Sequence, residues 1–133
     1  MKAADVMPAL LQACPGFEPA WRALSADGSG DLLYVAFGES ARYLHSKKKE
    51  GKEEELHAAA GFIERMHCEG DDYVRELATI GALEGIQNVW SHTDEGADAF
   101  APYLRSESKR WWYSLDRFWS GEIPHVGADI KQG

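Results

Sequence analysis

Apolar residues recur along most of the chain at intervals of three and four positions, the spacing that gathers side chains on one face of a helix. Leu56, Ala59, Ala60 and Ile63 are the clearest case. The pattern predicts helices at about 4–13, from Glu18 to a turn at 27–31, and at 32–46, 53–69, 72–91 and 107–120. The run 33–37 also fits a buried strand, and the pattern alone leaves that alternative open.

Turn-forming and capping residues mark where several of these helices begin and end. Gly70 ends the helix at 53–69, and Asp71 or Asp72 begins the next one. Ser106 is the expected N-cap of the last helix. Between the helices we expect three connections. These are an exposed, charge-dense run at 47–55 that forms a loop leading into the start of the next helix, an acidic loop at 92–98 and a short helix at 97–104.

The helix at 72–91 is apolar on most of its sides, which is typical of a helix at the centre of a domain. Gly81 and Gly85 lie four positions apart on it, and each costs about 1 kcal/mol relative to alanine in a helix interior. We therefore expect a neighbouring backbone to cross closely there. The sequence predicts an all-α protein, with a single compact domain of about six helices at 1–120 and a loosely ordered C-terminal tail at 121–133.

The last predicted helix carries three tryptophans. Trp111 and Trp112 point about 100° apart on a helix, so they cannot both face the same way. We expect one of them in the core and the other at the surface, beside Lys109 and Arg110. For these tryptophans, core packing and an anchoring role at an interface are both open explanations.

Composition narrows the class of protein. With 133 residues, 44% of them hydrophobic and 11% aromatic, the chain is long and apolar enough to form one domain with its own core. Its apolar runs are shorter than the ~20 residues that a membrane-spanning helix needs. A net charge of −8 argues against a nucleic-acid partner, because phosphate would be repelled. Two cysteines and the lack of an export signal lead us to expect a cytoplasmic protein.

The negative charge is concentrated in one quarter of the chain. Residues 71–104 carry seven acidic side chains and one basic side chain, Arg75, for a net charge of −6. Such a segment is either a solvated face or a docking surface that attracts a basic partner. Glu84, Asn88 and His92 follow one another at four-residue intervals, either on a half-exposed edge, in an internal network or along a concave docking site.

The sequence contains no recognisable metal or catalytic motif. Two Glu-x-x-His motifs, Glu54–His57 and Glu64–His67, fall on one predicted helix about 15 Å apart, too far to share a di-iron centre. The turn at 27–31 begins like a calcium loop, but Leu32 and Gly38 stand where glycine and glutamate are required. Motifs for phosphate loops, dinucleotides and serine nucleophiles do not occur. We expect no metal, no cofactor and no enzymatic activity.

One long segment, Gly70 to Asn88, and three short ones, Phe62–Glu64, Pro102–Leu104 and Lys109–Trp112, carry a family resemblance. Together they resemble a family of small, uncharacterised, all-helical bacterial proteins, over roughly residues 30–120. Some of its members resemble immunity proteins, which are paired with secreted antibacterial toxins. The resemblance implies a single-domain cytoplasmic protein without catalytic residues, and it favours the docking interpretation of the acidic segment.

We therefore expect an immunity-type protein that binds and neutralises a cognate toxin domain, with its acidic segment facing a basic site on the toxin. Neither nucleic acid nor a membrane is an expected partner. The alternative is a helical adaptor or regulatory module that binds a host protein or a small ligand. Trp90 and His92 are the expected anchors, and carboxylates supply the charge. The residues expected to contact the partner are Asp71, Asp72, Glu76, Glu84, Trp90, His92, Asp94, Glu95 and Asp98.

Overall fold

The predicted succession of helices is present in the computed structural model, which describes residues 1–27 and 32–130. The α-helices are α1 (Ala3–Ala13), α2 (Glu18–Asp27), α3 (Leu32–Lys49), α4 (Glu53–Glu69), α5 (Asp72–Glu76), α6 (Glu84–Trp90) and α7 (Ser106–Trp119). Short 3₁₀ turns are η1 (Pro15–Phe17), η3 (Ala97–Ala99) and η4 (Ala101–Tyr103), and η2 (Leu77–Leu83) is a π-helix. No strand occurs in the described ranges, and the chain forms one all-α domain. The expected turn at 27–31, with its resemblance to a calcium loop, lies outside the described residues beyond Asp27.

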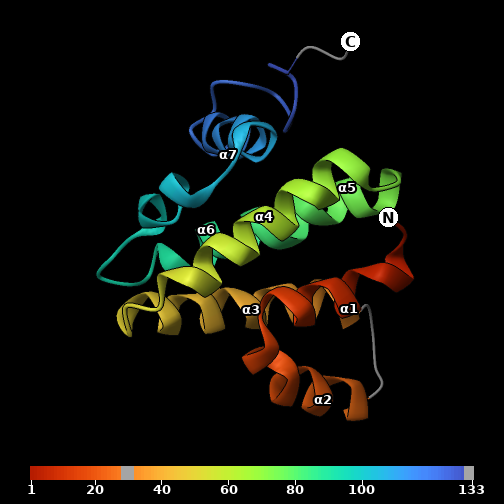
Figure 1. Ribbon diagram of the computed structural model, residues 1–133. Coiled ribbons are helices and arrows are strands. Elements are labelled where there is room, and N and C mark those ends of the chain that lie inside the picture. The colour runs from red at the N-terminus through yellow and green to blue at the C-terminus, as the bar shows by residue number, and fades with distance from the viewer. Residues whose placement is uncertain (28–31, 131–133) are drawn as a thin grey trace.

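The middle of the molecule is formed by α4 and a helical rod. The rod consists of α5, η2 and α6, which follow one another without a break. Figure 1 shows α1 and α3 on one side of α4 and α7 on the other, and contacts join the rod to α3, α4 and α7. The predicted central position of the apolar helix at 72–91 is therefore confirmed.

The π-helical segment Leu77–Leu83 changes which side of the rod is buried. A π turn contains about one residue more than an α turn. In the helix that follows, the positions on a given face therefore come one residue later in the sequence. An unbroken α-helical period would place Gly85 and Val89 on the inner face of the rod. The buried residues beyond the π segment are instead Ile86 and Trp90, one position later, together with the polar Gln87.

The junction between α4 and α5 is fixed by short-range hydrogen bonds. The Gly70 N–H donates to the Met66 carbonyl at 3.1 Å, and a Cβ on Gly70 would lie 2.3 Å from that oxygen, so only glycine fits. Asp71 caps α5 by accepting a hydrogen bond from the Val74 N–H at 2.9 Å. Arg75 donates from Nε to the Gly70 carbonyl, also at 2.9 Å. The predicted end of one helix and start of the next are both confirmed.

Three sequence-based interpretations of local structure are wrong. α3 continues to Lys49, because lysines in its last turn suit the negative end of the helix dipole, and the expected loop at 47–55 shrinks to residues 50–52. The strand alternative for 33–37 is wrong, since these residues belong to α3. The short helix expected at 97–104 is two separate 3₁₀ turns.

Aromatic side chains fill the core where the rod meets α7. Phe100 packs between Trp90 and Trp112, with ring centroids 5.3 and 6.3 Å away, and both indoles are fully buried. The Trp90 indole N–H donates to the Ala41 carbonyl on α3 at 2.9 Å. Of the neighbouring pair on α7, Trp112 is therefore the core residue, while Trp111 is only half-buried.

Candidate functional site

The acidic residues predicted to dock a partner lie at two ends of the rod and do not form one surface. The α5 end carries Asp71, Asp72 and Glu76, and the loop end, which follows α6, carries Asp94, Glu95 and Asp98. At 1.5 Å per residue, the rod separates the two ends by about 27 Å. Because this length of rod lies between them, we describe the two ends as separate sites.

Most of these carboxylates make no ion pair within the described part of the chain. Glu95 is the exception, because it pairs with His45 of α3, whose hydrogen bond lowers the pKa of Glu95. Asp71 is occupied as the cap of α5. Glu84 is half-buried, and burial raises the pKa of its carboxyl. Arg75, the one cation of the segment, donates to a backbone carbonyl and makes no ion pair with these carboxylates in the described ranges.

Trp90 is wrong as a surface anchor. Its side chain is 0% exposed and belongs to the aromatic core, because the π segment turns it inward. His92 lies on the surface just after the rod, where a partner can reach it.

A surface beside the loop end combines carboxylates with large exposed aromatic rings. Two shallow grooves, of about 270 and 380 Å³, both include Asp116 of α7 in their walls. Partial burial of Asp116 and the nearby charge of Asp98 raise the pKa of the Asp116 carboxyl. Trp119 is 58% exposed and Tyr113 46%. We call this surface the α6–α7 face, formed by Asn88, Asp98, Tyr113, Asp116 and Trp119.

A deeper cleft, of about 570 Å³, opens at the α5 end of the rod between α5, η2, α7 and the C-terminal tail. Its volume falls within the range of small-molecule sites in proteins. Thr79 and Ile80 reach it from the π-helix, a type of segment that often occurs at functional sites. The cleft is lined by His67, Asp72, Arg75, Glu76, Thr79, Ile80, Glu107, Arg110, Trp111, Val126 and Ile130.

A directed chain of hydrogen bonds runs behind this cleft. Ser108 lies 2.9 Å from Glu64 Oε1 and 3.0 Å from His67 Nδ1, and Thr79 Oγ1 lies 3.0 Å from His67 Nε2. An ionised carboxylate cannot donate, so the Ser108 hydroxyl donates to Glu64 and His67 must donate from Nδ1 to Ser108. The Nε2 atom then accepts from Thr79. This order fixes the tautomer and the orientation of His67.

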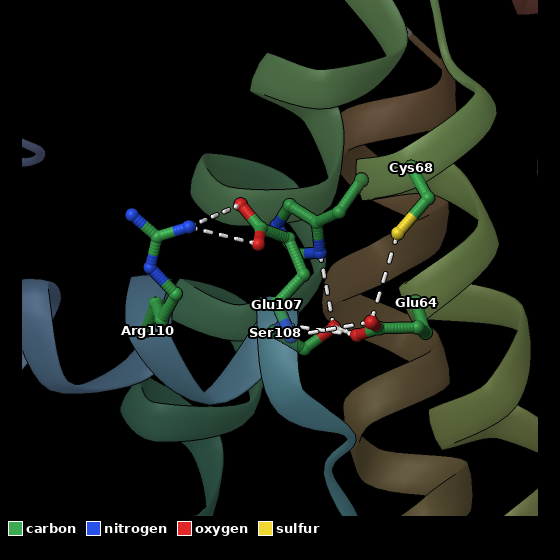
Figure 2. Close-up of polar contacts among 6 residues, drawn as sticks. Glu64, Cys68, Glu107, Ser108 and Arg110 are labelled. Atoms are coloured by element: carbon green, nitrogen blue, oxygen red, sulfur yellow. Dashed lines mark hydrogen bonds and ion pairs between the residues drawn. The ribbon is translucent and has the colours of Figure 1, made fainter. Parts of the chain in front are cut away.

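Glu64 also caps α7 from a different helix. Its carboxylate accepts from the backbone N–H groups of Glu107 and Ser108, at 3.2 and 2.9 Å (Figure 2). The expected cap, Ser106, is instead the first helical residue, and its side chain makes no cap. The prediction for Ser106 is wrong because an anion from α4 already satisfies the exposed N–H groups of this helix end.

Burial and hydrogen bonding set the charges in this network. His67 is buried, with 7% of its surface exposed, and burial lowers its pKa to about 4 despite the nearby charges of Glu64 and Glu107. Burial alone would raise the pKa of Glu64, but hydrogen bonds from Ser108 and Glu107 outweigh it and hold that pKa below its usual value. At neutral pH this hydrogen-bond network therefore contains a neutral His67 imidazole and an ionised Glu64 carboxylate.

The tail folds back on α7 and forms one wall of the cleft. The Gly127 N–H donates to Ser114 Oγ, and the Ser114 hydroxyl donates to Asp129, both at 2.7 Å. Arg117 pairs with Asp129 as well. These contacts place Val126 and Ile130 in the cleft wall, while the expected division into a domain at 1–120 and a loose tail at 121–133 stays a prediction.

Trp111 is held between α4 and this tail. Its indole stacks on the His67 ring, with centroids 6.4 Å apart and planes 3° from parallel. Gly127 has a φ of +90°, which favours glycine, and a Cβ there would lie 2.8 Å from the Trp111 ring. The apolar wall of the cleft thus depends on a close approach that only glycine permits.

Among residues 1–27 and 32–130, no cluster of three or more His, Cys, Asp or Glu side chains is arranged to hold a metal ion. Over the same residues, none of the helices has the length and apolar character needed to cross a membrane.

The model of a domain of unknown function, DUF7674, matches residues 7–120, so the chain belongs to that family. The match ends one residue after α7 and leaves out the tail that completes the cleft. No curated protein and no solved structure matches the chain.

Proposed function

We propose that this member of the DUF7674 family is an immunity-type protein, which binds a cognate antibacterial toxin domain in the cytoplasm and blocks it without catalysis. The partner is a protein with a basic active site or substrate groove. Contact with the acidic surface occludes that groove. Nucleic acid and membranes are not partners in this proposal.

The observation that carries the proposal is the α6–α7 face. Its carboxylates, Asp98 and Asp116, make no ion pair within the described residues, and they lie beside Trp119, the most exposed large aromatic side chain there. Unpaired carboxylates attract a basic partner and raise the rate of encounter. Exposed tryptophans are the residues that most often carry binding energy at protein interfaces. Both features favour binding to a basic protein surface.

Co-expression with the toxin encoded beside the gene tests this proposal. Charge reversal at the loop end (D94K/D98K) is expected to abolish protection. The matched control, D72K/E76K, makes the same change in net charge at the α5 end and is expected to keep protection. Protection that survives D94K/D98K, or that is lost equally in both variants, contradicts the assignment of the partner to the α6–α7 face.

A second candidate is an adaptor or regulatory module that binds a host protein or a small ligand. The observation that favours it is the cleft of about 570 Å³, which the toxin proposal does not use. Gene neighbourhood separates the two: an adjacent gene for a large secreted toxin supports the first candidate, and a transcription or transport operon supports the second.

A further inference from the structure

We propose that the cleft at the α5 end binds a small organic amine, a molecule with a protonated amino group on an aromatic or aliphatic body. This goes beyond the toxin proposal, because it concerns the opposite end of the rod. It names the ligand class for the second candidate.

The charge of the cleft selects a cation. Glu107 is paired with Arg110 at 3.0 Å. Arg75 donates from Nε to the Gly70 carbonyl, which positions its guanidinium but leaves its charge in the cleft. Asp72 and Glu76 remain, with no ion pair in the described part of the chain. They lie four residues apart on α5, hence on the same side of the helix, and both line the cleft. The lining holds three carboxylates, Asp72, Glu76 and Glu107, and two guanidinium groups, Arg75 and Arg110, so its net charge is 2 − 3 = −1 and favours an ammonium group.

The walls select an apolar body. Ile80 comes from the π-helix, Val126 and Ile130 from the tail, and Trp111 from α7, so three separate elements supply apolar surface to one space. His67 covers part of the Trp111 ring, and the tail holds the rest of it in place. A preformed apolar wall binds a ligand without first being ordered, which lowers the entropic cost of binding.

The floor supplies a fixed polar contact. Thr79 is 4% exposed and donates its hydroxyl hydrogen to His67, which leaves an oxygen lone pair as an acceptor. The chain through Ser108 to Glu64 keeps this hydroxyl oriented. An amine with one additional donor group is therefore favoured over a purely apolar amine.

Titration of phenethylamine into the isotope-labelled full-length protein tests the inference, with no partner present. We expect saturable chemical-shift changes at Thr79, Ile80 and the Trp111 indole. Phenethyl alcohol, which lacks the charge, is expected to bind about tenfold more weakly, the effect of losing two exposed ionic contacts. Phenylpropionate, which carries the opposite charge, is expected not to bind.

Two double variants complete the test. All four substituted side chains are exposed, so both variants are expected to keep the core intact. D72N/E76Q is expected to weaken phenethylamine binding about tenfold. D94N/D98N makes the same change in net charge at the loop end and is expected to leave the affinity unchanged. The inference is overturned if D72N/E76Q binds like the wild type, if phenylpropionate binds as tightly as the amine, or if the shifts fall outside the cleft or do not saturate. None of these outcomes depends on a toxin, so failure of the inference and failure of the toxin proposal are separate results.

Discussion

Glu64 on α4 accepts a hydrogen bond from the Ser108 backbone N–H and another from the Ser108 hydroxyl, each 2.9 Å long. One carboxylate thereby caps α7 and anchors the hydrogen-bond chain that orients His67 and Thr79. The geometry of the cleft is therefore coupled to the packing of α4 against α7. Substitutions along this chain report on both.

Glu64→Gln is expected to lower the free energy of unfolding by about 1–2 kcal/mol at pH 7, the usual cost of a lost cap and a charged hydrogen bond. Because the pKa of Glu64 is lower in the folded state, the carboxylate contributes fully above its usual value of 4.5 and loses its contribution as the pH falls through the lower folded value. The difference between wild type and variant should therefore shrink below pH 4.5. Urea denaturation across this range measures it, with Glu54→Gln on the exposed side of α4 as the control.

His67 gives the protein a second pH dependence. Its folded pKa of about 4 lies below the usual 6.5, so the unfolded chain takes up the proton first and stability falls as the pH drops from about 6.5 to about 4. Between pH 7 and pH 5 the loss is about 2 kcal/mol. His67→Gln should remove this part of the pH dependence, while His57→Gln, at an exposed position of the same helix, should keep it. Equal slopes for wild type and His67→Gln would show that the imidazole is not buried neutral.

The helices follow from the three-and-four spacing of apolar residues, and the fold class could be predicted for that reason. The π-helix could not, because Leu77–Leu83 is apolar on nearly every side and its sequence pattern has no gap that marks an extra residue. Beyond it, the helical spacing of the sequence therefore places the buried positions one residue too early. This single shift is why Trp90 was predicted at the surface and lies in the core.

Two glycines on the rod are expected to differ. A Cβ at Gly85 would lie 3.5 Å from the Phe37 carbonyl of α3, an ordinary contact, so the predicted close crossing is present and still has room for a methyl group. Gly85→Ala should stabilise the protein by up to about 1 kcal/mol through helix propensity. At Gly81 the Cβ would lie 2.8 Å from buried Leu77, and Gly81→Ala should cost about 1 kcal/mol through overpacking. Thermal unfolding of the two variants checks the order; a Gly85→Ala variant less stable than Gly81→Ala would contradict it.

The site was only partly predictable. The acidic residues were found because charge can be counted along the sequence. Their separation by a rod of about 18 residues, or about 27 Å, depends on the three-dimensional structure and could not be read from that count. Asp116 was missed because it lies in a segment with slightly positive net charge, and Trp119 because it follows the apolar pattern of α7. The cleft was missed entirely, since its walls come from three stretches that are far apart in sequence, 67–80, 107–111 and 126–130.

The tail wall of the cleft offers a matched pair of glycines. Gly121 and Gly127 both have positive φ, so alanine costs about 1–2 kcal/mol of backbone strain at either position. Only at Gly127 would the new methyl group also meet Trp111, whereas nothing lies within 4 Å at Gly121. Gly127→Ala is expected to release the tail and speed proteolysis within 121–130. Gly121→Ala should leave the Trp111 fluorescence unchanged, and a tail equally labile in both variants would show that the Trp111 contact does not hold it.

Calorimetric titration with the toxin domain encoded beside the gene tests whether the α6–α7 face binds a basic protein partner. The wild-type chain should bind with an affinity that falls as salt rises, because exposed charges are screened. D98N/D116N/W119A should bind about a hundredfold more weakly, while D72N/E76Q should bind like the wild type. An unchanged Kd for D98N/D116N/W119A, in protein that keeps its helical content, would contradict the account.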